Sequence, residues 1–324
     1  MTVRGAGAIG ATAAYGLAQG VRAFRGGNLK RFAIHADRVY SILRDARPTA
    51  VDPVNAMNAV REAMASETTV KMKQAIALDA ARKFADDNVA HCQAIGEHGA
   101  KLIRTGSTVL THCNAGWLAF VDVGSATAPM YVAQSRGTSF TVYCDETRPR
   151  CQGASLTAWE LGQQGIEHRV IADNAAGWLM QQGQIHLVIV GADRVLGRTG
   201  EIANKIGTYT RAVLAHRHGI PFYVAIPMST LDWDLKSGRD IPIEERNGSE
   251  VLGAWGRAEN PRARLRGVAA DPASDLTYVR IANPDSMAIN PGFDVTPPEL
   301  ITGIITPHGI FRPKDLGTLR RRGS

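Results

Sequence analysis

From about residue 106 onward, strand-like and helical segments alternate along the chain, and this alternation limits the fold more than any other feature. Short apolar runs rich in β-branched residues are each followed by a stretch of helical character. Such alternation predicts a parallel sheet with helices on both faces. We expect strands at 108–113, 140–144, 168–172, 187–190 and 221–225, and helices at 155–164, 175–181 and 204–218.

Residues 1–100 carry a different pattern, with Ala- and Leu-rich stretches and no β-branched alternation. Their apolar residues recur at three- and four-residue spacing, which is typical of helices. Asp52 and Pro53 offer a helix start, with Asp52 as the N-cap and Pro53 at the first helical position. We expect helices at 8–19, 28–45, 53–65 and 68–96.

Composition and charge narrow the class of protein. The hydrophobic content of 44% is ordinary for a folded protein, and neither a bilayer-spanning run nor a charged-then-apolar leader is visible. The four cysteines show neither a disulfide framework nor metal-ligand spacing, which favours a reducing, cytoplasmic location. The net charge of +7 favours phosphorylated metabolites or nucleic acid as partners. Because the cations do not gather with aromatic residues, an RNA-binding module is the weaker of these two alternatives.

A glycine-rich run from Gly5 to Gly10 matches the dinucleotide fingerprint GxGxxG. That motif requires a buried strand before it and an acidic residue about twenty positions further on. Only four residues precede Gly5, and the acidic residue is absent. We therefore expect no nicotinamide site and interpret the run as a helix entry that permits close packing. Arg4 beside a helix N-terminus would be suited to binding a phosphate.

Three polar segments, at 111–116, 145–153 and 191–194, each follow an expected strand. In an open α/β sheet, ligands bind beyond the carboxyl ends of the strands. We therefore expect the three segments to bring a thiol, carboxylates, arginines and amides to one rim. These groups together indicate chemistry on a sugar phosphate.

Cys113 and Asp193 are the candidate reactive groups at this rim. Cys113 ends a strand and enters a turn, where a partly exposed thiol near helix N-terminal amides would favour the thiolate. A small buried hydrophobe is the equal alternative for Cys113. Asp193 follows the apolar run 187–190, where poor solvation would raise its pKa and suit it to proton transfer. The alternative for Asp193 is a helix N-cap or a partner of Arg194.

Further cations and amides follow the same expected strands. Arg148, Arg150 and Gln152 lie in one turn and could bind phosphate or sugar hydroxyls. Ion pairs with the two acidic residues that begin this segment are an equal alternative for the arginines. Asn204 and Lys205 are expected to open a helix, an arrangement typical of phosphate sites, with an exposed helix lysine as the alternative.

Together these segments resemble the methylthioribose-1-phosphate isomerases. That family belongs to the superfamily of the α, β and δ subunits of the eukaryotic translation-initiation exchange factor. The resemblance runs almost end to end, through blocks at 3–10, 47–51, 113–116, 145–153, 191–194, 203–209, 243–246 and 293–297.

The resemblance implies a fold and a set of site residues. The expected fold is α/β, with a small helical N-terminal domain at 1–104 followed by a Rossmann-like catalytic domain at 105–324, whose parallel sheet has helices on both faces. The family needs no metal or redox cofactor and is usually dimeric. By match to the family, the catalytic residues are Cys113 and Asp193, and the substrate-binding residues are Arg4, Gly5, Ala6, Arg47, Gln152, Asn204 and Lys205.

The chain departs from the family pattern at four places. The Val-Arg-Gly-Ala block begins at Val3, whereas family members carry a longer segment before it. The family's Ala-Pro-Ala becomes Ala-Gly-Ala at 6–8. The stretch between Asp193 and Asn204 is one residue longer. Residues 254–280 form an insertion, within which the Arg-, Pro- and Gly-rich stretch 254–277 is expected to be a mobile surface loop. This insertion and the longer stretch after Asp193 could reshape the rim of the site.

We therefore expect an aldose-1-phosphate to ketose-1-phosphate isomerase that converts 5-methylthioribose 1-phosphate to 5-methylthioribulose 1-phosphate in methionine salvage. The related sugars 5-deoxyribose 1-phosphate and ribose 1,5-bisphosphate are alternative substrates. A non-catalytic regulatory subunit of the exchange-factor type is an alternative from another class, although it could lose the thiol–carboxylate pair that this chain retains. We expect a small sugar phosphate as partner, no nucleic acid or membrane, and a homodimer.

Overall fold

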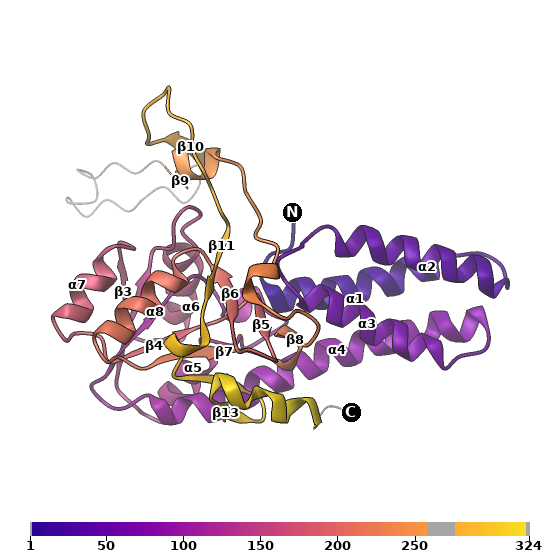
Figure 1. Cartoon of the computed structure of the whole chain (residues 1–324), viewed down its shortest axis with the longest axis horizontal. Helices are drawn as coiled ribbons and strands as arrows, with labels where there is room; N and C mark the ends of the chain where they lie inside the picture. Colours follow the sequence, from indigo (N-terminus) through magenta and orange to yellow (C-terminus); the bar gives the residue numbers. More distant parts are fainter. Residues whose placement is uncertain (1, 258–275, 322–324) are drawn as a thin grey trace.

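The computed structural model describes residues 2–257 and 276–321, in which a bundle of four helices precedes a sheet of mostly parallel strands. The bundle extends away from one side of the sheet, and its longest helix continues beneath the sheet (Figure 1). None of the described helices combines the length and the apolar character that crossing a bilayer requires.

The bundle consists of α1 (Ala6–Arg22), α2 (Leu29–Arg44), α3 (Asp52–Ala65) and α4 (Val70–Gly99). All four helices predicted for this region are confirmed. Leu17, Met57 and Val60 are fully buried between them, as the helical spacing of apolar residues requires. Asn28 and Thr69 cap α2 and α4, because their side-chain oxygens accept hydrogen bonds from backbone N–H groups of the first turn.

The prediction of Asp52 as an N-cap is wrong. The helix begins at Asp52 itself, Val51 is the N-cap residue, and Pro53 lies in the first turn as predicted. The Asp52 carboxylate instead accepts hydrogen bonds from the hydroxyls of Ser229 (2.6 Å) and Thr230 (3.1 Å) in the α/β region. Asp52 therefore joins the helical bundle to the sheet region rather than closing its own helix.

The main sheet has the strand order β13-β12-β7-β4-β1-β2-β3, with all neighbours parallel except β13 and β12. All five predicted strands are present and parallel, and β4, all of whose residues are buried, lies at the centre. The strands are β1 (Thr108–Thr111), β2 (Thr141–Asp145), β3 (His168–Ile171), β4 (Leu187–Val190), β7 (Phe222–Ala225), β12 (Gly303–Thr306) and β13 (Gly309–Phe311).

Helices cover both faces of this sheet, as predicted. On one face, Met180 of α7 and Ala212 of α8 pack in a core with Val188. On the other, the end of α4 and the helices α5 and α6 pack over Val109 and Ile189. These helices are α5 (Ala128–Ser135), α6 (Ala158–Gln163), α7 (Ala175–Gln181) and α8 (Thr208–Arg217), and a π-helical turn at Gly153–Thr157 leads into α6.

A second, smaller sheet was not predicted. It has the strand order β11-β6-β5-β8 and is mostly antiparallel. Its strands are β5 (Arg194–Leu196), β6 (Ile202–Lys205), β8 (Leu231–Asp232) and β11 (Phe293–Thr296).

The prediction that Asn204 and Lys205 open a helix is therefore wrong. Both residues lie on β6, where Lys205 pairs with Phe293 of β11. The helix begins four residues later, after Gly207, whose φ of 100° is one that side chains rarely permit. Gly207 thus ends the strand and turns the chain into α8.

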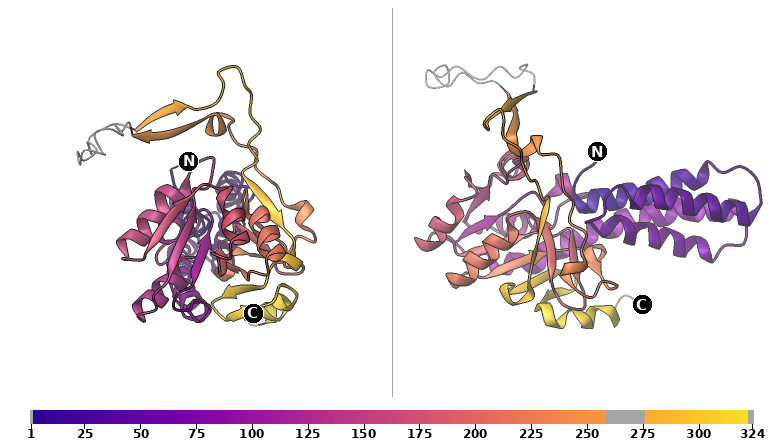
Figure 2. Two further views of the ribbon diagram at one scale, coloured as in Figure 1. Left: turned by 90° about the vertical axis from the view of Figure 1, so that its left-hand side faces the viewer. Right: turned by 45° about the horizontal axis from the view of Figure 1, so that its top comes forward.

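The antiparallel strands β9 (Gly253–Arg257) and β10 (Leu276–Arg280) project from the body of the molecule next to the short helix α9 (Ser249–Leu252) (Figure 2). The sequence predicted a mobile loop at 254–277. Its described ends are paired strands, which corrects that part of the prediction, and residues 258–275 lie outside the described residues. Short 3-10 turns lie at Ala100–Leu102, Trp117–Ala119, Met228–Thr230, Gly238–Asp240, Pro298–Leu300 and Pro313–Arg321.

Candidate active site

A cavity of about 250 Å³ lies at the carboxyl ends of β1 and β4, where the start of α1 and the strand β6 also meet. We call it the rim cavity. The strand-end rule predicts this position. All nine predicted site residues line it: Arg4, Gly5, Ala6, Arg47, Cys113, Gln152, Asp193, Asn204 and Lys205. Their roles remain predictions, but residues as far apart as 4 and 205 share one cavity.

The backbone fixes Cys113 directly after β1. Its N–H donates to Thr147 Oγ1 (2.8 Å), its carbonyl accepts from Thr157 Oγ1 (2.7 Å), and its φ of 67° is unusual for a residue other than glycine. Burial raises the pKa of the half-buried Cys113 thiol, and the nearby Lys205 opposes this effect. No helix begins here, since a short 3-10 turn follows at 117. The prediction of a thiolate favoured by helix amides is therefore wrong, and burial favours the neutral thiol.

Asp193 is held between the two sheets and the bundle. Its N–H donates to Ala203 O (2.9 Å), its carbonyl accepts from Val51 N (3.2 Å), and its Oδ1 lies 3.7 Å from Arg47 Nη2. Burial raises the pKa of Asp193, as predicted from its position after an apolar strand, and Arg47 is the first of the cations that oppose it. The carboxyl group is thus suited to hold a proton closer to neutrality than an exposed aspartate.

The two alternatives for Asp193 are contradicted. Arg194 pairs with Asp232 (2.5 Å) and donates to the carbonyls of Thr49 and Pro48. The element that follows Asp193 is a strand, β5, so the residue caps no helix. Its carboxylate is left facing the rim cavity.

Three cations surround the ring of Phe293 beside Asp193. Lys205 Nζ lies 4.3 Å from the ring centroid, and the guanidinium carbons of Arg246 and Arg47 lie at 5.2 and 6.0 Å. Glu244 pairs with both arginines, each at 3.1 Å. Arg246 and Phe293 line the cavity but had no predicted role, although both lie in blocks that carried the family resemblance.

Lys205 and Arg4 differ from these arginines because neither forms an ion pair with any residue that the structure describes. Lys205 Nζ donates to the Gly292 carbonyl (2.9 Å), and burial lowers the pKa of Lys205 while Cys113 opposes this shift. Arg4 precedes α1 and is exposed at the cavity, where desolvation and then the nearby Arg150 and Arg246 lower its pKa. An anion in the cavity would relieve both effects.

The glycine run serves packing, as predicted. Gly5 is the N-cap of α1 with a φ of 96°, and a Cβ atom there would lie 2.3 Å from Ala119 Cα. Residues 2–4 form no strand. The approach of α1 to the turn at 117–119 places Arg4 at the cavity.

The arginines of the turn after β2 have other partners than predicted. Arg150 pairs with Glu250 (2.8 Å), and Arg148 donates to the carbonyls of Glu250, Val251 and Gly253. The alternative of ion pairs with Asp145 and Glu146 is therefore wrong. Arg150 and Gln152 line the rim cavity, and Gln152 Oε1 is buried without a partner in the described chain.

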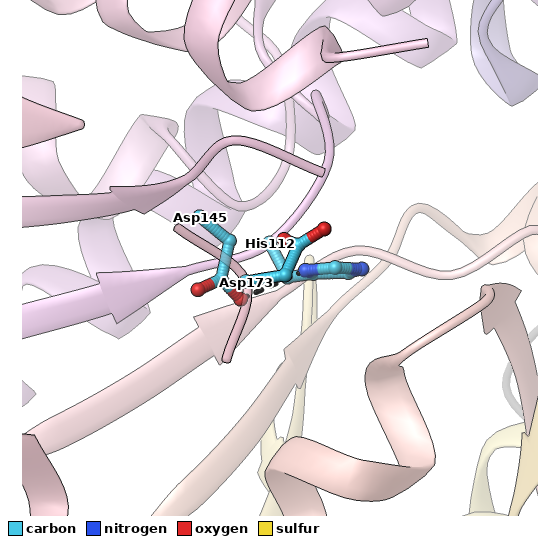
Figure 3. Close-up of side chains that lie close together, drawn as sticks. All are labelled: His112, Asp145 and Asp173. Atoms are coloured by element: carbon cyan, nitrogen blue, oxygen red, sulfur yellow. Dashed lines mark hydrogen bonds and ion pairs between the residues drawn. The ribbon is translucent and has the colours of Figure 1, made fainter. Parts of the chain in front are cut away.

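Directly beside Cys113 lies a group of charged and ionisable side chains, His112, Asp145, Asp173 and Arg211, which we call the ion cluster; all are buried except Asp173, which is partly buried. Figure 3 shows His112, Asp145 and Asp173. His112 Nδ1 lies 2.8 Å from Asp145 Oδ2, and Nε2 lies 2.9 Å from the Ile206 carbonyl. Both ring nitrogens therefore have an oxygen atom of the chain within hydrogen-bond distance. Arg211 donates to Asp145 (2.7 Å) and Asp173 (3.2 Å).

The ion cluster is the one group of potential metal ligands found among the described residues. Its donor set does not fit a metal ion. Arg211 already donates to both carboxylates, and both ring nitrogens of His112 already have hydrogen-bond partners in the chain. The cluster ties the end of β1 to β2 and to the turn before α8.

Comparisons with known proteins place the chain among relatives of known name. The profile of the Initiation factor 2 subunit family matches residues 2–313. A methylthioribose-1-phosphate isomerase of Methylobacterium nodulans is 45% identical over an alignment 332 positions long, gaps included, which covers 99% of this chain and 84% of that protein.

Two solved structures resemble the fold closely. The 5-methylthioribose 1-phosphate isomerase from Pyrococcus horikoshii OT3 has a TM-score of 0.77 and 41% identity, and the match covers 99% of this chain and 84% of that one. The delta subunit of translation initiation factor eIF-2B from A. fulgidus has a TM-score of 0.72 and 37% identity, covering 97% and 85%. An isomerase and a translation factor subunit therefore share this architecture.

Proposed function

The chain belongs to the Initiation factor 2 subunit family, and we propose that within it the chain acts as a methylthioribose-1-phosphate isomerase. The observation that carries this proposal is the rim cavity, where a thiol, a carboxyl group and two cations without acidic partners meet. Relatives at about 45% identity over nearly the whole chain bear the isomerase name. The reaction is an aldose–ketose isomerisation, which belongs to methionine salvage.

The chemistry requires two proton-handling groups. A phosphate on the anomeric oxygen blocks ordinary ring opening, so the furanose must open by protonation of its ring oxygen. Hydrogen then moves from C2 to C1. We propose that Cys113 and Asp193 share these tasks, since burial raises the pKa of both groups and favours their proton-bearing forms.

The charge balance of the cavity supports a substrate with one phosphate. Of its five cations, Arg47 and Arg246 pair with Glu244, and Arg150 pairs with Glu250. This leaves Arg4 and Lys205 for an anion. A second phosphate, as in ribose 1,5-bisphosphate, would have to displace carboxylates from the paired arginines.

Apolar side chains line the same cavity and support an apolar 5-substituent. Leu118, Leu156 and Phe120 provide carbon surface without a hydrogen-bonding group. A methylthio group would be desolvated there at a gain of roughly 25 cal/mol per Å² of buried surface. A hydroxyl or phosphate would gain no partner from these three residues.

We further propose that the enzyme works in the cytoplasm as a homodimer and that the helical region 1–104 and the α/β region 105–324 are separate domains. Four free cysteines support a reducing compartment. A non-catalytic regulatory role is the second candidate, supported by the likeness to the eIF-2B subunit. The retained pair Cys113 and Asp193 favours the enzyme.

The test is phosphorus NMR of the purified protein with 5-methylthioribose 1-phosphate, 5-deoxyribose 1-phosphate and ribose 1,5-bisphosphate in separate samples. The proposal predicts that the methylthio sugar is converted to its ketose 1-phosphate with the highest kcat/KM. Faster conversion of the bisphosphate would contradict the substrate assignment. No conversion of any of the three would support the regulatory role instead.

A further inference from the structure

We propose that Asn114 is a substrate-binding residue, whose side-chain carbonyl accepts a hydrogen bond from a sugar hydroxyl next to the reacting carbons. We propose in addition that Glu160 is the positioning residue that orients it. Both statements rest on the proposed isomerase function. Neither residue was among the predicted site residues, although Asn114 directly follows Cys113 and lines the rim cavity.

The hydrogen bonds of Asn114 define which way its amide points. Its Nδ2 lies 3.1 Å from Thr157 Oγ1 and 3.0 Å from Glu160 Oε1. The hydroxyl proton of Thr157 is directed to the Cys113 carbonyl at 2.7 Å, so its oxygen is free to accept. Both neighbours of Nδ2 are therefore acceptors, and a flipped amide would place Oδ1 against them.

With Nδ2 occupied, Oδ1 is the amide atom that remains for a ligand. It is buried, and it has no hydrogen-bond partner among residues 2–257 and 276–321. A buried carbonyl oxygen without a partner is costly and rare in native structures. Because Asn114 lines the cavity, a hydroxyl of a bound sugar can supply the missing donor.

Glu160 makes this orientation rigid. The residue is fully buried on α6, and its Oε1 also accepts from Leu118 N (3.1 Å), while its Oε2 accepts from Trp117 N (3.1 Å) and Tyr131 Oη (2.7 Å). A Cβ atom on Gly116 would lie 1.6 Å from Glu160 Oε2, so the turn closes tightly around the carboxylate. Three donors other than Asn114 therefore fix Glu160, and Glu160 in turn orients Asn114.

The chemistry of an amide oxygen defines what Asn114 can do. It accepts a hydrogen bond but exchanges no proton, so it selects and orients a hydroxyl rather than catalysing the hydrogen shift. Asn114 adjoins Cys113, which we place at the reacting carbons C1 and C2. The hydroxyls within reach of this position are those on C2 and C3 of the sugar.

A cycle of protein and substrate changes tests the proposal. The 3-deoxy form of 5-methylthioribose 1-phosphate is compared with the parent sugar by its kcat/KM. The 2-deoxy form cannot isomerise, so its inhibition constant is compared with the KM of the parent sugar. Both comparisons are made for the wild type and Asn114→Ala. For the wild type, we expect that loss of one of these hydroxyls lowers kcat/KM, or raises the inhibition constant above the parent KM, by roughly threefold to tenfold. For Asn114→Ala, we expect the same loss to change these values very little.

This cycle separates binding from structural damage. A distorted Cys113 loop would weaken the use of the parent sugar and the use or binding of the deoxy sugars equally, so the ratios between them would not change. If removal of each hydroxyl has the same effect on the wild type and on the variant, Asn114 does not bind either hydroxyl and the proposal is overturned. If the wild type does not convert the parent sugar at all, the isomerase function fails instead.

Three further variants complete the design. Asn88→Ala removes a buried amide that does not line the rim cavity, and we expect it to keep the wild-type hydroxyl preference. Glu160→Gln retains the size of the side chain but replaces one acceptor oxygen with an amide NH2 group, which donates hydrogen bonds. We expect it to reduce the same hydroxyl preference as Asn114→Ala, whereas an unchanged preference would refute its positioning role. Asn114→Ser replaces Asn114→Ala in the cycle if the latter does not fold.

Discussion

His112 and Cys113 are neighbours in the chain, yet they belong to two polar regions with opposite properties. In the ion cluster, the charged groups mostly pair within the chain: Arg211 contacts Asp145 and Asp173, and Asp145 Oδ2 lies against His112, although Asp145 Oδ1 has no partner in the described chain. In the rim cavity, Arg4 and Lys205 lack acidic partners within the described chain, and the carbonyl oxygens of Asn114 and Gln152 are left without donors. Balanced buried charge is typical of structural support, whereas unbalanced polar groups around a cavity indicate a ligand.

This difference predicts that substitutions in the rim cavity mainly reduce activity and that substitutions in the ion cluster mainly reduce stability. The same residue types occur on both sides of the comparison. An aspartate can therefore be compared with an aspartate and an arginine with an arginine.

The largest effect is expected for Cys113→Ser. The hydroxyl is close in size to the thiol but ionises far less readily, so kcat should fall by about 10²–10⁴ while substrate binding changes little. Steady-state kinetics and calorimetric titration measure the two quantities. Cys151→Ser is the matched control, since Cys151 is also half-buried but does not line the rim cavity. Near-normal turnover by Cys113→Ser would show that this thiol serves only packing.

A similar loss of kcat, about 10²–10⁴-fold, is expected for Asp193→Asn, because an amide cannot exchange a proton. Burial raises the pKa of Asp193, so a carboxylic acid that donates a proton should lose activity as the pH rises through that pKa. In the wild type, kcat should therefore fall as the pH rises through the pKa of Asp193. The residual kcat of the variant should not show this fall. If Asp193→Asn is active and its kcat depends on pH as in the wild type, Asp193 has only a structural role.

The same substitution in the ion cluster should act on stability instead. Asp145→Asn leaves the buried Arg211 without its carboxylate partner on β2, and loss of one partner from a buried ion pair costs about 3–5 kcal/mol. Chemical denaturation measures this change. Asp193→Asn serves as the comparison and should lose much less stability. Equal losses in the two variants would remove the distinction between the two regions.

A smaller effect is expected for Arg4→Ala, which removes a cation that has no acidic partner in the described chain. A hydrogen bond to a charged group contributes about 1.5–3 kcal/mol, so KM should rise roughly tenfold to a hundredfold with little change in kcat. Arg22→Ala, at the other end of the same helix, is the control and should leave KM unchanged. An unaltered KM in Arg4→Ala would place the phosphate elsewhere.

The smallest effect concerns Asp52, the buried carboxyl group that joins the bundle to the sheet region. Burial raises its pKa to about 6 from 3.8, so the folded state binds more protons than the unfolded state between these values. Stability contributed by Asp52 is therefore present below about pH 4 and is lost as the pH rises through 6. Asp52→Asn should be more stable than the wild type at pH 7.5, by roughly 1–3 kcal/mol, and similar to it near pH 4. A difference that does not depend on pH would contradict this.

Five strands of the main sheet and the four helices of the bundle were predictable because these elements have strong local patterns, whereas β12 and β13 were not predicted. Residues 187–190 form an unbroken apolar run, and all four are buried at the sheet centre. The second sheet was not predictable, because β8 has only two residues and β6 pairs with β11 at a distance of about ninety positions in sequence. Asn204 and Lys205 were assigned to a helix for this reason, since nothing local reveals their distant partner.

The site was predictable in part. Strand ends indicated Cys113 and Asp193, and family resemblance supplied the seven binding residues that line the same cavity. The ion cluster and the role of Glu160 could not be found this way. Their side chains are polar residues inside apolar elements, and only the folded structure shows which charges they balance.

The most direct test of the account is a crystal structure of Cys113→Ser with 5-methylthioribose 1-phosphate bound. The account predicts the sugar in the rim cavity, with C1 and C2 between Ser at position 113 and Asp193, the phosphate on Arg4 and Lys205, and the ion cluster unchanged. A sugar phosphate bound outside this cavity, or bound in it with its reacting carbons away from both residues, would contradict the central claim.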